Sequence, residues 1–200
     1  MIGQVTNHKL YHVTLTKPYK QAFVVNQSVK IGDAYNPFFG FYEGAREYPV
    51  TQADGSILQI RAVAFLRQAR DGQINSPQLA TIATEVAVHY VMLCRELIME
   101  EIRRDEFNSV PPSRQRCLYG CNTLDEARYW NQRIGESGTI CELTCTGSIH
   151  RADARLLLGD SEPLSLTRDR ARAYWRGDVG QNPEMETLFV GNATVSGFGL

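Results

Sequence analysis

The chain has 200 residues, of which 43% are apolar and 22% charged, a balance typical of globular proteins whose core is large enough for an enzyme. With 21 Lys and Arg against 22 Asp and Glu, the net charge of −1 gives no overall electrostatic preference for nucleic acid or acidic membranes. No apolar run is long enough to span a membrane and no standard secretion signal is visible, so we expect no membrane partner and a location in the cytoplasm, or delivery into that of a target cell.

The first predicted element is a short strand at Leu10–Leu15, in which alternation places Leu10, His12 and Thr14 on one face. Residues 29–48, which follow it, are rich in Gly, Pro and aromatic residues. Such a composition predicts irregular structure that serves as a lid or a binding loop.

Two helices are expected in the middle of the chain, as a helical insertion at about residues 56–106. The first spans Ser56–Arg70, with Ser56 as its cap, and the second spans about Ser76–Arg104, where Pro77 occupies the favoured first position. The charged run Arg95–Asp105 near the end of the second helix has i,i+4 spacing. This spacing is typical of a solvated helix face.

The rest of the chain favours strands, with two helices among them. In chain order we expect a strand at Arg116–Tyr119, a helix at Asp125–Arg133 capped by Thr123 or Asp125, a strand at Thr139–Thr144, a partly helical stretch at Leu164–Trp175, and a strand at Met185–Val195 broken by a hairpin-like turn near Gly191-Asn192. The predicted architecture is a single α+β domain over residues 1–200, with a split, mostly antiparallel sheet.

Five cysteines favour free thiols in a reducing compartment. Two pairs share one spacing, Cys117 with Cys121 and Cys141 with Cys145, which raises the alternative of a zinc site. Four residues along a strand span about 13 Å, too far for one metal ion, although a turn at Gly120 could bring the first pair together. We therefore predict no metal site and keep zinc as the weaker alternative.

Three residues far apart in sequence carry the clearest chemistry: His12, Tyr119 and Glu186. Each lies in a predicted strand, so a sheet is able to bring them together. An imidazole, an aromatic ring and a carboxylate suit a nicotinamide riboside whose glycosidic bond is to be broken. On the helix after Tyr119, Tyr129 and Trp130 offer further rings that can sandwich a flat heterocycle.

This ordered set resembles the ADP-ribosyltransferase fold family, in the His-Tyr-Glu branch of diphtheria-type toxins and poly(ADP-ribose) polymerases. The chain also looks like small bacterial toxin-like proteins that carry Pro-Ser-Arg before the second motif. The blocks that match are Leu10-Tyr11-His12-Val13-Thr14, Pro112-Ser113-Arg114, Cys117-Leu118-Tyr119, Ala127-Arg128-Tyr129-Trp130 and Glu186-Thr187-Leu188-Phe189-Val190. The resemblance covers these short blocks and their order rather than the whole chain.

The resemblance implies catalytic roles for the triple. His12 would hydrogen-bond the nicotinamide ribose, and the backbone of Val13 would hold the carboxamide. Tyr119 would stack on the nicotinamide together with Tyr129 or Trp130. Glu186 would bind the ribose 2′-hydroxyl and stabilise the oxocarbenium-like transition state as nicotinamide leaves.

Three further positions are implicated with less direct chemistry. Ala127 falls where many family members keep a serine, so a hydrogen bond to the carboxamide is missing or supplied elsewhere. Arg114 is expected to contact a phosphate of NAD or to cap the sheet. Glu184 forms a Glu-x-Glu with Glu186, and in the arginine-modifying branch such a first Glu activates the acceptor.

The expected function is therefore transfer of ADP-ribose from NAD, as substrate, to a macromolecule, with release of nicotinamide. The acceptor is a protein side chain or a nucleic-acid base, and a bacterial or phage toxin or effector of this kind would have an antitoxin or immunity protein as partner. Two alternatives remain open: an NAD glycohydrolase with water as acceptor, and a non-catalytic module that binds NAD or a partner.

Overall fold

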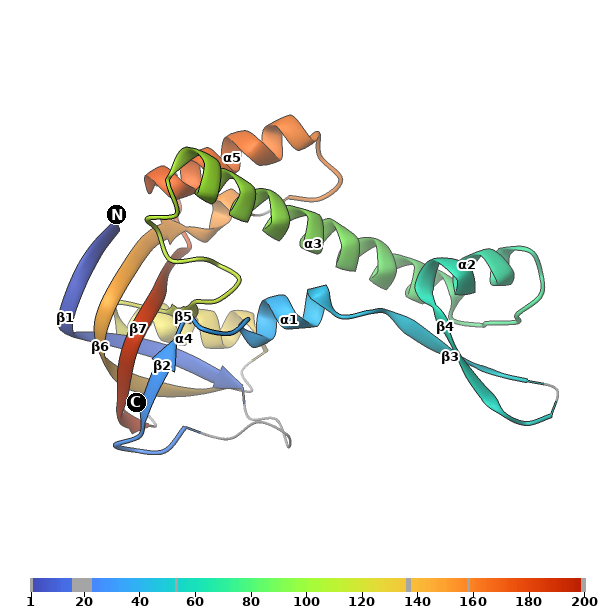
Figure 1. Ribbon diagram of the computed structural model, residues 1–200, viewed down its shortest axis with the longest axis horizontal. Helices are drawn as coiled ribbons and strands as arrows, with labels where there is room; N and C mark the ends of the chain where they lie inside the picture. The colour runs from blue at the N-terminus through green and yellow to red at the C-terminus, as the bar shows by residue number, and fades with distance from the viewer. Residues whose placement is uncertain (1, 16–22, 53, 136–137, 158, 199–200) are drawn as a thin grey trace. The chain divides into compact units, whose positions relative to one another are not determined.

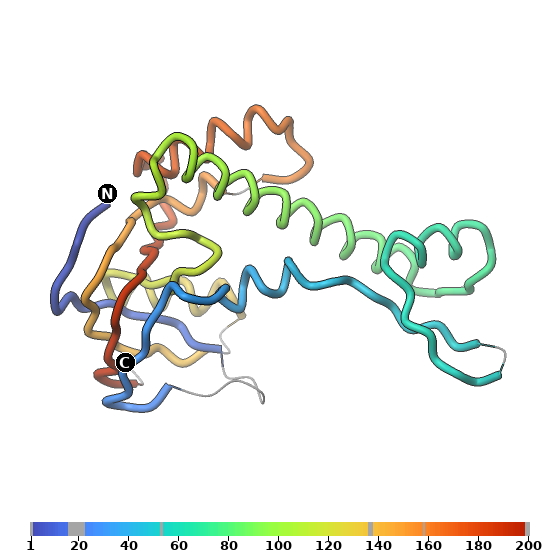
Figure 2. The backbone as a smooth tube through the Cα atoms, in the orientation of Figure 1, coloured from blue at the N-terminus to red at the C-terminus, as the bar shows by residue number. Residues whose placement is uncertain are grey.

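The computed structural model describes residues 2–15, 23–52, 54–135, 138–157 and 159–198. The chain forms two compact units, one made of Met1–Asn36 with Glu96–Leu200 and the other of Pro37–Arg95. Both are visible in the ribbon and the backbone tube (Figures 1 and 2). The predicted α+β class with mostly antiparallel strands is confirmed.

The elements of the first unit are β1 (Ile2–Leu15), β2 (Ser28–Ile31), the end of α3 (Leu79–Glu106), β5 (Leu118–Gly120), α4 (Leu124–Arg133), β6 (Gly138–Asp153), the 3-10 helix η1 (Ala154–Leu157), α5 (Leu164–Arg176) and β7 (Met185–Phe198). The elements of the second unit are α1 (Pro37–Glu43), β3 (Glu47–Thr51), β4 (Ile57–Arg61), α2 (Ala62–Arg70) and the beginning of α3. In the described part of the chain, no helix is long and apolar enough to cross a membrane.

The sheet of the first unit is antiparallel throughout, in the order β1-β6-β7-β2, and its β7 edge is divided. β5 pairs with residues 187–189 of β7, whereas β2 pairs with residues 191–194. Just after β5, Cys121 exchanges two backbone hydrogen bonds with Tyr11 of β1, at 2.9 and 2.7 Å. The pairing thus runs from β1 through β6, β7 and β5 back to β1, and it brings the expected first, second and third motifs to neighbouring strands.

The prediction of a hairpin-like turn near Gly191-Asn192 is wrong, because β7 continues through these two residues. Gly191, with φ 144°, lies opposite Gly147, with φ 158°. A Cβ on Gly147 would lie 2.2 Å from the carbonyl oxygen of Val190, and one on Gly191 would lie 2.4 Å from that of Thr146. The two glycines therefore permit a close approach of β6 and β7 at the point where β7 changes its neighbour from β5 to β2.

The helix expected from Ser56 begins later, and Ser56 belongs to a hairpin turn instead. Its backbone N–H and its hydroxyl both donate to the Asp54 carboxylate, at 2.9 and 2.6 Å, and Gly55 takes φ +82°. Ile57–Arg61 then pairs with β3 as β4, and the helix starts at Ala62. Residues 29–48, expected to be irregular, likewise contain most of β2, the whole of α1 and the beginning of β3.

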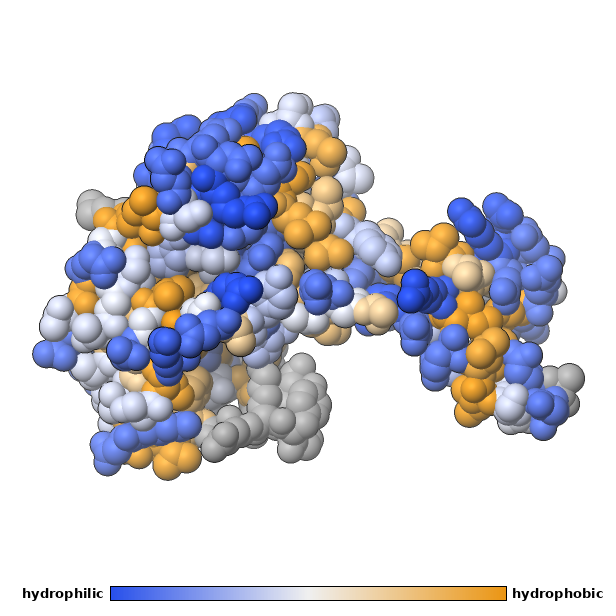
Figure 3. Space-filling model, viewed as in Figure 1, coloured by the Kyte–Doolittle hydropathy of each residue, from blue (hydrophilic) through white to orange (hydrophobic). Residues whose placement is uncertain are grey.

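The second unit also differs in its limits from the insertion expected at about 56–106. It includes the whole β3–β4 hairpin and ends at Arg95, so the last three turns of α3 belong to the first unit. Ile57 and Leu58 on the hairpin are 67% and 52% exposed, and Figure 3 shows apolar residues at the surface of this unit. Inside this unit, buried His89 accepts a hydrogen bond from Arg46 at 3.1 Å.

Two core clusters lie on opposite faces of the main sheet, as the alternation of Leu188 and Phe189 along β7 requires. The cluster that contains Leu188 packs α3 and α5 against the sheet, and we call it the helix-side core. Its largest members are Ile98, Met99, Ile102, Leu157, Tyr174, Trp175 and Leu188. A third, small cluster packs α4 against β1 and β6 around Ala127.

Candidate active site

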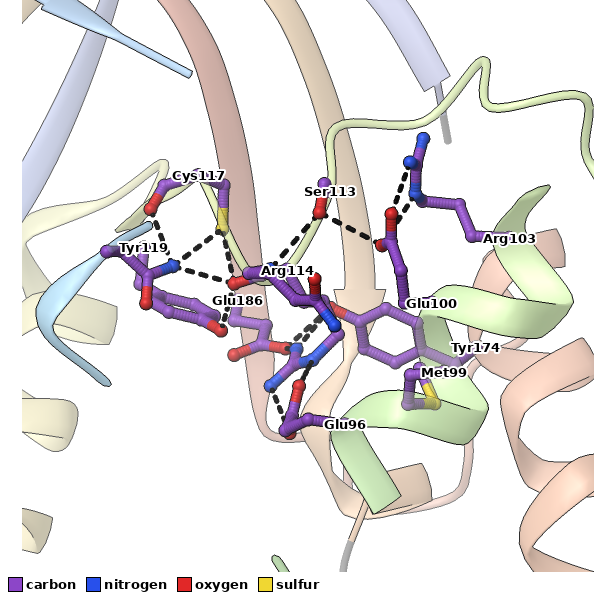
Figure 4. Close-up of polar contacts among 12 residues, drawn as sticks. Glu96, Met99, Glu100, Arg103, Ser113, Arg114, Cys117, Tyr119, Tyr174 and Glu186 are labelled. Atoms are coloured by element: carbon purple, nitrogen blue, oxygen red, sulfur yellow. Dashed lines mark hydrogen bonds and ion pairs between the residues drawn. The ribbon is translucent and has the colours of Figure 1, made fainter. Parts of the chain in front are cut away.

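Glu186, the second residue of β7, lies at the edge of the helix-side core with a side chain that is 10% exposed. The register opposes Tyr119 to Leu188, so Tyr119, Leu188 and Glu186 share one face of β5 and β7. Two donors converge on a single oxygen of Glu186: Arg114 Nη1 and the Tyr174 hydroxyl both donate to Oε1, the latter at 2.6 Å (Figure 4). Tyr119 and Glu186, predicted to cooperate, are thus in one buried assembly.

Arg114 is the centre of this assembly and is 3% exposed. Its Nε donates to Glu96 Oε2 at 3.0 Å, and its guanidinium carbon lies 5.2 Å from the ring centroid of Tyr119 and 5.1 Å from that of Tyr174. Burial alone would lower the pKa of Arg114, but the carboxylates of Glu186 and Glu96 raise it well above the usual value. Arg114 therefore stays charged and balances buried carboxylates.

The two tyrosine hydroxyls are hydrogen-bond donors within the same assembly. Tyr174 accepts from Arg114 Nη1 at 2.8 Å and donates to Glu186, while Tyr119 donates to the backbone carbonyl of Arg114 at 2.8 Å. Burial raises the pKa of both phenols well above the usual value, against the opposing effect of the Arg114 charge. Both hydroxyls consequently keep their protons at neutral pH.

The loop before β5 holds Arg114 in place through contacts on both sides of it. Ser113 donates to Glu100 Oε2 at 2.9 Å, and Arg103, itself ion-paired with Glu100, donates to the carbonyl of Pro111 at 2.9 Å (Figure 4). The Asn36 amide donates to the carbonyl of Arg114 at 2.6 Å. The backbone of this loop is therefore tied to α3 on one side and to the segment after β2 on the other.

His12 reaches the assembly through the backbone of β5. Its Nδ1 lies 2.7 Å from the carbonyl oxygen of Tyr119, and its ring packs edge-on against Phe23 at 5.7 Å between centroids. The structure thus brings His12 next to the second motif, with this nitrogen bound to main chain rather than to Glu186. The predicted role of His12, a hydrogen bond to the nicotinamide ribose, stays a prediction.

The two candidate stacking residues of α4 lie in different environments. Trp130 Nε1 donates to the carbonyl of Met185, the neighbour of Glu186, at 2.8 Å, and Trp130 packs with Tyr119 against the helix-side core. Tyr129 is 41% exposed and contacts Trp130 edge-on at 5.7 Å. Of the two, Trp130 is the ring that the structure places beside Tyr119 and Glu186.

Val13, Ala127 and Glu184 lie outside this assembly. Ala127 is fully buried on the inner side of α4, and Val13 packs against the same small cluster while it pairs with Ile140 of β6. Glu184 is buried between two arginines, 3.2 Å from Arg155 Nε and 3.4 Å from Arg133 Nη2. Its predicted part in activating an acceptor would require one of these ion pairs to open.

Sequence reasoning missed two members of the assembly, Glu96 and Tyr174. Glu96 stands in the charged run expected to form a solvated face, yet it is 1% exposed. Glu96 stands three residues before Met99 and seven before Arg103, a spacing that places the three on one helix face. Met99 belongs to the helix-side core and Arg103 is buried as well. Tyr174 is fully buried, with no local pattern that announces a partner on another element.

The cysteines are distributed over different clusters rather than gathered at one point. Cys117 lies in the helix-side core, Cys121 beneath α4, and Cys141 with Cys145 on the other face of the sheet. Burial raises the pKa of Cys121 and Cys145 to about 12 and that of Cys141 to about 11. Within the described residues, no group of three or more His, Cys, Asp or Glu side chains is arranged to hold a metal ion.

Comparison with known proteins gives a family without an assigned activity. Residues 10–197 match the model of the family described as "Protein of unknown function (DUF2441)". No curated protein matches the chain. The match includes every residue of the assembly around Arg114.

Proposed function

The chain belongs to the family described as "Protein of unknown function (DUF2441)", and we propose that it is an NAD-dependent ADP-ribosyltransferase that modifies a macromolecule and releases nicotinamide. The observation that carries the proposal is the environment of Glu186. Oε1 of its carboxylate accepts from Arg114 and Tyr174, and among the described residues no hydrogen bond to Oε2 is formed. A carboxylate with one fixed oxygen and one oxygen for a ligand suits the ribose 2′-hydroxyl of NAD.

The surroundings of Glu186 also fit the nicotinamide end of the substrate. Tyr119 and Trp130 are partly buried against the same core cluster, and Trp130 binds the carbonyl of Met185, the neighbour of Glu186. Flat heterocycles stack on such rings. β5 pairs with β7 next to Glu186, and His12 binds the Tyr119 carbonyl of β5, so all three motifs adjoin β5, with His12 on the opposite face of the sheet from Glu186.

In the proposed reaction, the bond between ribose C1′ and nicotinamide N1 breaks heterolytically, and its electron pair leaves with neutral nicotinamide. The positive charge left on the ribose is stabilised by the carboxylate of Glu186. A nucleophilic atom of the acceptor then bonds to C1′ and loses its proton to solvent. Protein or nucleic acid would serve as acceptor.

Labelled NAD tests the proposal and separates it from the alternatives. The protein is incubated with adenylate-labelled NAD and bacterial lysate, and the protein, RNA, DNA and small-molecule fractions are counted separately. Label in a macromolecular fraction supports the transferase. Label only in free ADP-ribose supports a glycohydrolase, and unchanged NAD with measurable binding supports a non-catalytic module; either result would overturn the proposal.

A further inference from the structure

The contacts of Glu186 leave its carboxylate little freedom to rotate. Arg114 Nη1 and the Tyr174 hydroxyl approach the same oxygen, and Nη1 also donates to that hydroxyl at 2.8 Å, so the three groups form a closed triangle of hydrogen bonds. All three side chains are buried. Rotation of the carboxylate would break two charge-assisted bonds at once.

Arg114 is itself fixed from three directions. Its Nε binds Glu96 on α3, its guanidinium lies between the rings of Tyr119 and Tyr174, and its carbonyl accepts from the Asn36 amide at 2.6 Å (Figure 4). The position of Oε1 is therefore set by residues from α3, α5 and the loop before β5. None of these contacts reaches the other oxygen.

We propose that Arg114 and Tyr174 are positioning residues, which hold Oε1 of Glu186 so that Oε2 faces the ribose of NAD. The inference rests on the proposed function and adds two residues to it. In this role Arg114 does not bind a phosphate of NAD, because its guanidinium is already occupied by Glu96, Glu186 and Tyr174. A loosely held carboxylate would slow bond cleavage without weakening the binding of NAD.

Tyr174→Phe is the variant that isolates this role, since it removes one hydroxyl and keeps the buried ring. We expect kcat for nicotinamide release to fall about 10- to 100-fold while KM for NAD changes less than about twofold. The matched control is Trp175→Phe, which removes a buried hydrogen bond of the neighbouring residue, from Trp175 Nε1 to the Met99 carbonyl at 2.8 Å. That control is expected to lower thermal stability and to keep kcat.

Arg114 is tested by rescue. Arg114→Lys keeps a positive charge and is expected to retain part of the kcat that Arg114→Met loses, with KM again little changed. Should Arg114→Met fail to fold, the comparison of Tyr174→Phe with Trp175→Phe decides alone. Equal kcat values for these two variants, in an active wild-type background, would overturn the positioning role and leave the proposed function standing. A wild-type protein that releases no nicotinamide would overturn both.

Discussion

The end of α3 makes ionic contacts on two faces. Both faces use Glu–Arg pairs of similar length, but the pairs differ in burial. On the inner face, Glu96 binds Arg114 at 3.0 Å, with side chains that are 1% and 4% exposed. On the outer face, Glu101 binds Arg168 at 3.0 Å and Glu106 binds Arg172 at 2.8 Å. Figure 3 shows the region over α5 as strongly hydrophilic.

The length of an ion pair alone says little about what the pair contributes to stability. A surface pair exchanges water for a partner of similar strength, and many such pairs contribute nothing measurable. A buried pair contributes little net stability either, but loss of one member leaves a charge without solvent or partner, which is costly. The inner face should therefore tolerate no single change, and the outer face should tolerate most.

The largest effect is expected from Arg114→Met. The substitution leaves the carboxylates of Glu96 and Glu186 without their shared cation, so we expect a loss of about 3 to 5 kcal/mol in the free energy of unfolding. Urea denaturation followed by circular dichroism measures it, with Arg172→Met on the outer face as the matched control. A loss for Arg114→Met no greater than for its control would contradict the difference expected between the two faces.

The next largest loss of stability is expected at low pH, and it comes from His150, a residue next to the inner face. His150 is fully buried and its Nε2 bonds to the Tyr174 carbonyl at 3.0 Å. Burial lowers its pKa from 6.5 to about 4. Between these values the unfolded chain binds a proton that the folded protein does not, so stability falls as pH drops from 6.5 to 4, by about 3 kcal/mol in total.

The contribution of His150 is isolated with His150→Gln, an uncharged side chain of similar polarity. We expect the variant to be less stable at neutral pH and to lose less of its remaining stability between pH 6.5 and pH 4, the two pKa values of the residue. The free energy of unfolding is measured at both pH values. Parallel losses in wild type and variant would contradict the assignment of this titration to His150.

Glu96→Gln and Glu101→Gln make the same change on the two faces of α3. Glu96→Gln removes one of the two carboxylates that bind Arg114 but keeps a hydrogen-bond acceptor, so we expect a moderate loss of about 1 to 3 kcal/mol. It is measured by urea denaturation, as for Arg114. A variant as stable as the wild type would mean that Glu186 alone suffices to balance the buried guanidinium.

The smallest effect is expected from Glu101→Gln. Arg168 lowers the pKa of Glu101 through its hydrogen bond, against a small opposing effect of burial, but both side chains reach solvent. We expect no change in stability beyond experimental error, and any small difference at low salt should vanish in high salt. A salt-independent loss as large as that of Glu96→Gln would show that the two faces are equivalent.

Local patterns predict the elements of this protein better than their partners. The helix at Leu124–Arg133 and its Thr123 cap are confirmed, with Thr123 accepting from the Glu126 N–H at 3.2 Å. The strands around His12 and Glu186 are confirmed as well, and both extend further than expected. Each of these carries its signal in neighbouring residues, as caps and alternation do.

The wrong predictions share one cause, which is contact between residues far apart in the sequence. Glu96 is buried because it pairs with Arg114, which lies 18 residues later and binds Glu186 a further 72 residues along the chain. The helical period around Glu96 carries no sign of these partners. Gly191 has the composition of a turn, yet its conformation serves close contact with Gly147 across the sheet. Tertiary partners decide such cases: Arg114 was a candidate from the sequence, whereas its contacts with Glu186 and Glu96 were not predictable from it.

The most direct test of the account is the initial rate of nicotinamide release from NAD by Glu186→Gln, at matched folded concentration. We predict a rate at least about 100-fold below that of the wild type, because the charge that stabilises the oxocarbenium-like transition state is gone. Glu101→Gln, the same change on the outer face of α3, should match the wild type. Undiminished release by Glu186→Gln would contradict the account.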